Sequence, residues 1–466
     1  MSRHATVRNR PGRRRALPAH ARVAQPVAGA RWTRLARKAA TAALLVAGLL
    51  PAPAARAAGT GTAVPSGLNA VACPSVTVCV AVGAVEVYDK SASGTLLRAS
   101  YTAMALRSTD GGKDWVPVQL PSVPADLTGV SCMSTTACIA VGATETVYDG
   151  LVYPVGAVVL RLSGDAGQVV RELPSGARAL LAVSCNGPST CLAAGGADRL
   201  GAVDLRPEML ATKDAGSHWT NVGLPIVSGQ LQGISCGAPS QCVAVGVNAY
   251  VADKQGGGVT TTGPAPIGLS SSDGGRSWKV ATLPPGPSSG GPAGPASGGP
   301  DSVGCSPGGH CVAAGDRFNW CQCGTGEPGH YAMTWSSDNG GATWSVHVLP
   351  TISNFDVWYA TSVSCWAGAC AVAGTGSRPQ PGSDYYALFL PLSASGTPGG
   401  PLASSATSLR PQWVDGLSCH AVTVCVAVGE DWSTPARAAI ETRSGARWAT
   451  TFTASPRPPA GVRSGT

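Results

Sequence analysis

The sequence predicts an all-β protein made of seven copies of one unit, and two observations carry this prediction. A cysteine hairpin motif recurs seven times at intervals of 51–69 residues, and a turn motif containing Gly and Trp follows most copies. The chain also holds 61 Gly and 37 Pro but few strong helix formers, which excludes helical bundles and coiled coils. Seven units of about four strands match a seven-bladed β-propeller, whose closed ring hides the sheet edges. An open β-solenoid would need caps and shorter, more even repeats.

The first 58 residues differ from the rest in charge. They carry 12 Lys and Arg side chains and no Asp or Glu, so the net charge of +8 arises here and the remainder is slightly acidic. An apolar run at residues 39–50 follows three basic residues, and Ala55-Arg56-Ala57 offers a cleavage site. This order is typical of a secretory signal peptide, and twelve apolar residues are too few to span a bilayer. We expect residues 1–58 to direct export to the cell envelope or medium; an N-terminal anchor that stays uncut is the alternative.

All 16 cysteines follow this leader, and an even number is typical of an oxidising compartment. The first hairpin motif reads VACPSVTVCVAVG from Val71. Val, Ile and Ala predict two short strands, and the polar residues between the cysteines predict a tight turn that brings the sulfurs within bonding distance. Zinc is disfavoured because four ligands at C-x-x-C spacing are missing. We expect one hairpin disulfide per blade: Cys73 with Cys79, Cys132 with Cys138, Cys185 with Cys191, Cys236 with Cys242, Cys305 with Cys311, Cys365 with Cys370, and Cys419 with Cys425.

The second motif has the form S-x-D-x-G-x-x-W. Its Asp carboxylate can accept backbone N–H groups across a turn, its Gly supplies a positive φ, and its Trp opens the next strand and buries its ring between sheets. In blade five the best frame places Asn339 at the Asp position, and the unit after Cys365 has only a vague counterpart near Ser393. The residues assigned to these structural turns are Ser108, Asp110, Gly112 and Trp115; Ser163, Asp165 and Gly167; Asp214, Gly216 and Trp219; Asp273, Gly275 and Trp278; Asn339, Gly341 and Trp344; and Gly445 and Trp448.

This turn resembles the Asp-box, or BNR, repeat of sialidases, sortilin-type receptors, xyloglucanases and photosystem II assembly factors. With the cysteine-centred strand and the C-V-A-V-G strand before it, the order looks most like the bacterial assembly-factor branch. The resemblance covers roughly residues 66–452 and implies a β-propeller. It implies little about activity, because the same repeat serves enzymes, receptors and assembly factors.

The repeat also predicts the domain boundaries. Blades are expected to start near residues 66, 127, 180, 231, 301, 360 and 414, after a short linker at 59–65 and before a disordered tail at 453–466. The Pro-Gly-Ser stretch at 285–300 and the long connections of blades one and four are predicted surface loops, where binding usually resides.

A catalytic constellation is not evident in the sequence. The resemblance to sialidases would require an R-I-P segment and three clamping arginines, yet no such segment exists and arginine is sparse. A xyloglucanase-like hydrolase would need two carboxylates about 5 Å or about 6–9 Å apart. The candidate acids outside the Asp-box turns are taken to be Glu86, Asp89, Glu145, Asp149, Asp356, Asp415, Glu430 and Asp431, among others, and solvated loop charges are the plainer interpretation.

Blade five carries the two remaining cysteines, Cys321 and Cys323, next to Trp320. An additional disulfide is favoured over a metal site, because a fourth ligand is not evident. Trp320, beside cysteines in a loop, is the candidate ligand contact. Neither a metal nor another cofactor is predicted, and a slightly acidic chain after the leader argues against a nucleic-acid partner.

These observations predict a secreted, non-catalytic β-propeller that serves as a recognition or scaffold module for an extracellular protein or glycan. The alternative is an extracellular glycoside hydrolase of the sialidase or xyloglucanase type, so whether the chain is an enzyme stays open. A weaker hypothesis, by analogy with the photosystem branch, is an envelope assembly factor. We expect a monomer without a transmembrane segment after the leader.

Overall fold

The computed structural model describes residues 62–90, 96–148, 151–197, 206–248, 251–255, 258–262, 265–285, 297–318, 330–350, 357–377, 385–393, 396–397, 413–431, 437–445 and 447–452. The predicted leader, the tail at 453–466, and Trp320, Cys321 and Cys323 lie outside these ranges. Within them every regular element is a β-strand. None of the described residues forms a helix long and apolar enough to cross a membrane.

The first four blades are four-stranded antiparallel sheets in simple chain order, except that blade four carries an inserted hairpin. Their strands are β1 (Thr62–Ala72), β2 (Cys79–Lys90), β3 (Leu96–Ser108) and β4 (Val116–Pro117); β5 (Ala125–Cys132), β6 (Ala137–Tyr148), β7 (Leu151–Ser163) and β8 (Ala166–Val169); β9 (Ala179–Cys185), β10 (Cys191–Ala197), β11 (Glu208–Thr212) and β12 (Thr220–Asn221); and β13 (Gln230–Ala238), β14 (Gln241–Val247), β17 (Pro266–Ser271) and β18 (Lys279–Ala281), with the inserted pair β15 (Val251–Gln255) and β16 (Gly258–Thr262).

The last three blades follow the same order, with three strands among the described residues of blade six. Their strands are β19 (Ser297–Cys305), β20 (Cys311–Phe318), β21 (His330–Ser337) and β22 (Ser345–Val348); β23 (Val357–Trp366), β24 (Ala369–Ser377) and β25 (Tyr385–Leu392); and β26 (Trp413–Ala421), β27 (Val424–Asp431), β28 (Arg437–Ser444) and β29 (Arg447–Phe452).

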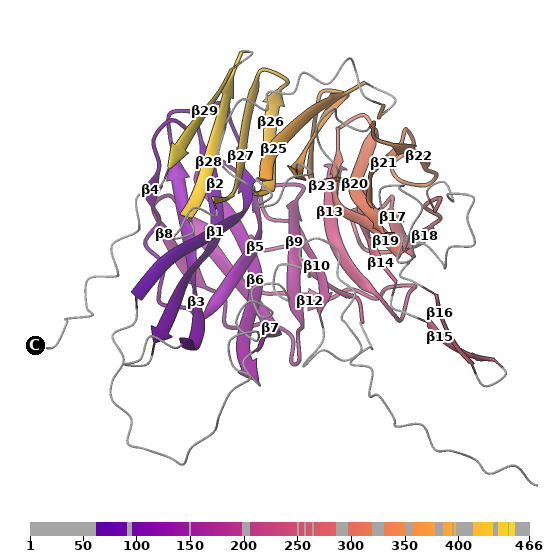
Figure 1. Ribbon diagram of the computed structural model, residues 1–466, viewed down its shortest axis with the longest axis horizontal. Coiled ribbons are helices and arrows are strands. Elements are labelled where there is room, and N and C mark those ends of the chain that lie inside the picture. Colours follow the sequence, from indigo (N-terminus) through magenta and orange to yellow (C-terminus); the bar gives the residue numbers. More distant parts are fainter. Residues whose placement is uncertain are drawn as a thin grey trace, which may run out of the picture.

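The seven sheets form a closed ring, so the predicted seven-bladed β-propeller is confirmed. The first strand of each blade contacts the first strand of the next, and β1 also lies against β26, β27 and β28 of the last blade. Figure 1 shows the first blade (indigo) beside the last (yellow). Each blade is built from consecutive strands, so the ring closes by packing between blades rather than by a strand shared between the two chain ends.

The cores lie between neighbouring blades because both faces of each sheet are apolar. One cluster, for example, joins Val80 and Val82 of blade one to Leu127, Ala140 and Leu160 of blade two, all buried. The C-V-A-V-G strands supply the small residues that let adjacent sheets pack this closely.

All seven hairpin disulfides of the prediction are present, one in each blade. The strand bounds differ from the expectation at two places. β1 begins at Thr62, inside the predicted linker, and β19 begins at Ser297, inside the predicted Pro-Gly-Ser loop. In both cases the extra residues extend a ladder with the following strand, which supplies backbone partners that composition does not reveal.

Candidate functional site

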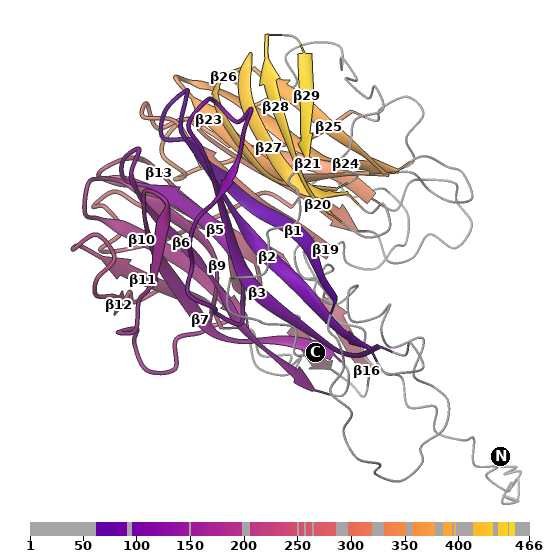
Figure 2. The same ribbon diagram turned by 90° about the vertical axis from the view of Figure 1, so that its left-hand side faces the viewer.

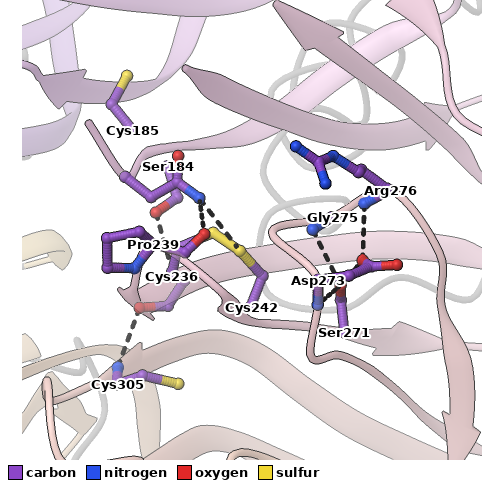
Figure 3. Close-up of a disulfide and its surroundings, with 12 residues drawn as sticks. Ser184, Cys185, Cys236, Pro239, Cys242, Ser271, Asp273, Gly275, Arg276 and Cys305 are labelled. Atoms are coloured by element: carbon purple, nitrogen blue, oxygen red, sulfur yellow. Dashed lines mark hydrogen bonds between the residues drawn. A yellow bond between two sulfur atoms is a disulfide. The ribbon is translucent and has the colours of Figure 1, made fainter. Parts of the chain in front are cut away.

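The S-x-D-x-G-x-x-W turn of blade four shows the hydrogen bonds that these motifs make (Figure 3). The hydroxyl of Ser271 donates to Asp273 at 2.8 Å and accepts from the N–H of Gly275 at 2.9 Å. The Asp273 carboxylate in turn accepts the N–H groups of Arg276 and Ser277 at 2.9 and 3.0 Å. Bonds from the Ser277 side chain and backbone hold the pKa of Asp273 below its ordinary value. The Asp273 carboxylate thus forms its hydrogen bonds within the turn itself.

The same turn recurs in blades one, three and five. Asp110 accepts from Lys113 N–H at 3.0 Å, Asp214 accepts from Ser217 N–H at 3.0 Å, and Asn339 accepts from Thr343 N–H at 3.0 Å. Each Trp indole donates to the carbonyl of the second Gly, as Trp115 does to Gly112 at 2.9 Å. These rings pack against the preceding blade, which places Trp219, Trp278 and Trp344 in inter-blade cores. The turns thus place these three tryptophans in the packing between blades.

Two blades depart from the expected turn. In blade two Ser163 pairs directly with Ala166, so Gly164 and Asp165 form a tight two-residue hairpin, and Asp165 instead pairs with Arg107 at 3.1 Å. In blade seven Ser444 pairs with Arg447, which leaves Gly445 at a φ of 67° in a similarly short connection. Gly164 at a φ of 58° permits the first of these hairpins, because the left-handed conformation suits glycine.

Blade six retains a trace of the motif. Gly396 has a φ of 74° and lies against Ser336 of the preceding blade. The Thr334 hydroxyl donates to its carbonyl at 3.2 Å, as Thr442 does to Gly112 at 2.9 Å. Gly396 therefore takes the place of the second Gly of the motif, close to the vague counterpart expected near Ser393.

Each turn is also tied to the cysteine hairpin of its own blade. Gly111 N–H donates to Thr77 O at 2.8 Å and Gly274 N–H to Ser240 O at 2.9 Å, and the same bond is present in blades two, three, five and seven. Both sets of turns consequently lie at one end of the ring. The carboxylates of Asp110, Asp214 and Asp273 at this end accept backbone N–H groups of their own turns.

A second set of bonds links the cysteine hairpins around the ring (Figure 3). In five of the seven seams, the N–H of the first Cys of one blade donates to the hydroxyl of the Ser that precedes the first Cys in the preceding blade, at 2.9–3.0 Å. The donor and acceptor pairs are Cys73 with Ser418, Cys185 with Ser131, Cys236 with Ser184, Cys305 with Ser235, and Cys419 with Ser364. The equivalent residues in the other two seams, Ala72 and Gly304, have no hydroxyl.

Every innermost strand has a β-bulge within its length, four residues before its first Cys. The bulged residues are Asn69, Thr128, Leu181, Gln232, Asp301, Thr361 and Asp415. A bulge re-aims a side chain, and in three of these strands the bulged polar residue bonds to a backbone carbonyl of the next blade. Asn69 donates to Leu127 O at 2.8 Å, Thr128 to Leu180 O at 2.8 Å, and Thr361 to Val414 O at 2.6 Å. The sequence analysis did not identify these residues, because they share a position relative to the first Cys and not a side-chain chemistry.

Acidic and aromatic residues lie together in blades six and seven, at the end remote from the cysteine hairpins. Trp413 lies 5.5 Å from Tyr359 and 6.0 Å from Tyr385, measured between ring centroids, and pairs with Glu430 across the sheet. Asp415, Glu430 and Asp431 are all buried here. Of the eight acids singled out in the sequence, Glu86, Asp89, Glu145, Asp149 and Asp356 have no described side chain. Within the described ranges, no group of three or more His, Cys, Asp or Glu side chains is arranged to hold a metal ion.

One exposed contact joins blades two and three. The His218 ring lies against Asp214 of its own turn and 3.1 Å from Glu172 of blade two. The hydrogen bond with Asp214, with the charges of Asp214 and Glu172, raises the pKa of His218 above its ordinary value. The backbone and side chain of His218 in turn lower the pKa of Asp214.

Comparison with known proteins finds similar chains among solved structures alone. No protein-family model and no curated protein matches the chain. Among solved structures, similar ones are YCF48 bound to D1 peptide (14% identity, TM-score 0.40, covering 72% of this chain and 82% of that one), an ancestral GH74 enzyme (12%, 0.37, 84% and 62%) and the phage phi92 endosialidase (10%, 0.41, 81% and 65%). The chain thus spans slightly less than two thirds of the last two. All three are β-propellers, and at these values their activities say nothing about this chain.

Proposed function

We propose that the chain is an exported, non-catalytic Asp-box β-propeller that recognises an extracellular protein. The basic leader with its apolar run supports export, and so do seven disulfides, which persist in oxidising compartments. The hydrogen bonds of four Asp-box turns support membership of that repeat class. A recognition role, rather than hydrolysis, agrees with turn carboxylates that are committed to backbone N–H groups.

The observation that carries the proposal is a pair of β projections on adjacent blades. β2 runs on to Lys90 and β6 to Tyr148, whereas β10 of blade three ends at Ala197, two residues after its Gly195. Figure 2 shows β1, β2 and β3 (indigo) running beyond neighbouring strands. Among the described residues, β6 beyond Thr144 pairs with β7 only, since β5 begins at Ala125 opposite Thr144. A strand edge with one partner accepts an extended peptide through backbone hydrogen bonds.

The experiment shortens the projections. One variant joins Val85 to Thr102 through Asn-Gly and another joins Thr144 to Gly156 in the same way, because both residue pairs face each other in the ladders. A matched control removes the β15–β16 hairpin of blade four. Crosslinking pull-down from the native secretome, read by mass spectrometry, is expected to lose the same protein with the first two variants and retain it with the control. Equal capture by all variants, or binding to a glycan array that survives trimming, contradicts the proposal.

A second candidate, glycoside hydrolysis, is favoured by one observation. Asp415 and Glu430 lie at the same end of the ring as Tyr359, Tyr385 and Trp413, and carboxylates beside aromatic rings are the equipment of sugar-cleaving sites. Purified protein is assayed on sialosides and β-glucans with Glu430→Gln as the matched variant. Hydrolysis that this single change abolishes would replace the recognition role with the hydrolase.

A further inference from the structure

Blade seven breaks the repeat at a core position. The third-strand residue opposite the middle residue of the C-V-A-V-G strand is large, apolar and buried in six blades: Leu106, Leu160, Leu210, Leu269, Trp335 and Leu390. In blade seven it is Glu441, opposite Ala427 and only 4% exposed. A carboxyl is thus buried between blades six and seven, where the fold otherwise places leucine or tryptophan.

The facing wall of blade six is smaller than its counterparts. Leu106 of blade one packs against Val426 and Val428 of the preceding blade. The equivalents of these valines in blade six are Ala371 and Ala373, and every other blade has a larger side chain at one of the two positions at least. A carboxyl against two alanines replaces a leucine against two valines. This contact, which we call the blade six–seven seam, therefore has less apolar surface to bury.

Blade seven also lacks a glycine contact that ties the outer part of each other blade to the blade before it. In six blades a glycine in or beside the turn between the third and fourth strands lies so close to the preceding blade that a side chain on it would collide: Gly112, Gly167, Gly216, Gly275, Gly341 and Gly396. Among the described residues, nothing lies within 4 Å of a side chain placed on Gly445, because the connection of blade seven is short. The outer strands of the seam therefore have fewer ties than those of the other seams.

The inner strands of the same two blades are joined more firmly. The outer strands β25 and β28–β29 meet through the rings of Phe389 and Trp448, edge to face at 5.1 Å, with the Arg443 guanidinium over the Phe389 ring. The inner strands share three hydrogen bonds of 2.6–3.0 Å: Cys419 N–H to the Ser364 hydroxyl, the Thr361 hydroxyl to Val414 O, and Val414 N–H to the Thr375 hydroxyl. This difference lets the outer strands separate while the inner strands stay together.

The Glu441 carboxyl has little to stabilise a charge. Within the described residues it forms no ion pair, and its one hydrogen bond is from Thr450 at 3.5 Å. Burial raises the pKa of Glu441 to about 8, although the hydrogen bond from Thr450 lowers it. An unpaired carboxylate in apolar surroundings is costly, so the closed seam favours the neutral acid.

Other titratable and charged groups lie on the strands packed around Glu441. None belongs to a residue that lines the small space beside the carboxyl. They are Tyr385 and Tyr386 on β25, Asp415 and His420 on β26, Glu430 and Asp431 on β27, Arg437 and Arg443 on β28, and Arg447 on β29.

We propose that the blade six–seven seam is a pH-dependent gate in the ring, whose outer strands lie together while Glu441 carries its proton and separate as that proton is lost to solvent. Opening brings the carboxylate into water and exposes the Phe389 and Trp448 rings, while the bonds between the inner strands keep the ring joined. The gate is independent of which partner the blade one and two projections take.

The gate has a defined pH window. In the open seam the carboxyl is in water and has the ordinary glutamate pKa of about 4.3, whereas in the closed seam the pKa is about 8. The stability of the closed seam is therefore fully present below the ordinary value and is lost as the pH rises toward the raised one. The open fraction is expected to rise about tenfold per pH unit between about pH 5 and about pH 7.5, and to level off above about pH 8.5.

Hydrogen–deuterium exchange of the full chain, read by mass spectrometry and corrected for the intrinsic pH dependence of exchange, measures this opening as lost protection. Peptides from β25 and from β28–β29 are expected to lose protection about tenfold per pH unit within the window. Peptides from β9 and β10 of blade three are the internal control and are expected to keep theirs.

Two variants separate the carboxyl's charge from its shape. Glu441→Gln cannot ionise and is expected to abolish the pH dependence at β28–β29. Glu441→Leu restores the residue of the other blades and is expected to do the same while raising protection at every pH. Circular dichroism checks that both variants fold. The same pH dependence in Glu441→Gln as in the unchanged chain, an equal loss of protection in all blades, or protection of β28–β29 that does not change with pH overturns the proposal.

Discussion

The N–H of Cys73 in the first blade donates to the Ser418 hydroxyl in the last blade at 3.0 Å, across the seam where the ring closes. Ser418→Ala is expected to lower the free energy of unfolding by about 1 kcal/mol, the usual cost of one lost internal hydrogen bond. Chemical denaturation measures this effect. Ala72→Ser is the converse test, because it supplies the hydroxyl that the seam between blades one and two lacks, and it is expected to stabilise the chain by a similar amount. If Ala72→Ser brings no gain in stability, a serine hydroxyl does not stabilise the contact between blades one and two as it does the contact between blades seven and one.

The Asp-box turns predict a loss of stability in acid. The pKa values of Asp214 and Asp273 are lowered in the folded chain, so their contribution is present above the ordinary aspartate value of about 4 and is lost as the pH falls through the lowered values. Replacing both with Asn, which Asn339 shows the turn accepts, is expected to flatten the decline in melting temperature between about pH 4 and pH 2. Asn339→Asp is expected to steepen it. An unchanged acid profile in the double variant would contradict this account of the turns.

The contact between His218 and Glu172 predicts the opposite dependence. The pKa of His218 is raised in the folded chain, so its contribution is present below the ordinary histidine value of about 6.5 and is lost as the pH rises through the raised value. NMR titration of Glu172→Gln is expected to show a lower His218 pKa than in the unchanged chain, and one still above the ordinary value because Asp214 remains. If the pKa of His218 is the same with and without Glu172, this contact does not link blades two and three.

Much of the fold follows from short local patterns. The recurring pairs of cysteines five or six positions apart mark the first two strands of each blade, and the Ser, Asp, Gly and Trp of the turns mark the third and fourth. Comparing motifs could not predict a turn whose geometry depends on the backbone conformation of a single residue. Asp165 matches the motif in letters, yet Gly164 closes a two-residue hairpin before a longer turn can form.

The features outside the motifs were hidden for a different reason. The bulged residues Asn69 and Thr128 differ in chemistry, and what unites them is a position relative to the first Cys and a carbonyl in the next blade. Glu441 is a buried acid at a position where the other blades have a large apolar residue. This difference is visible only when the third strands are aligned by their pairing, because the sequence of β28 alone has the pattern of an ordinary half-polar strand. Both require the pairing of strands, which a single-chain pattern does not contain.

Our central claim is that the repeat serves the scaffold and that function lies where the repeat is broken. The most direct test is the free energy of unfolding of Glu441→Leu, with Glu441→Gln alongside, measured by denaturant titration at pH 7. Glu441 is buried opposite Ala427, at the third-strand position where five of the other blades have leucine. Restoring that leucine replaces a buried carboxyl with apolar surface, so Glu441→Leu is expected to be more stable than the unchanged chain by about 1–2 kcal/mol. A Glu441→Leu variant less stable than the unchanged chain would show that the carboxyl is part of the scaffold, and would contradict the claim.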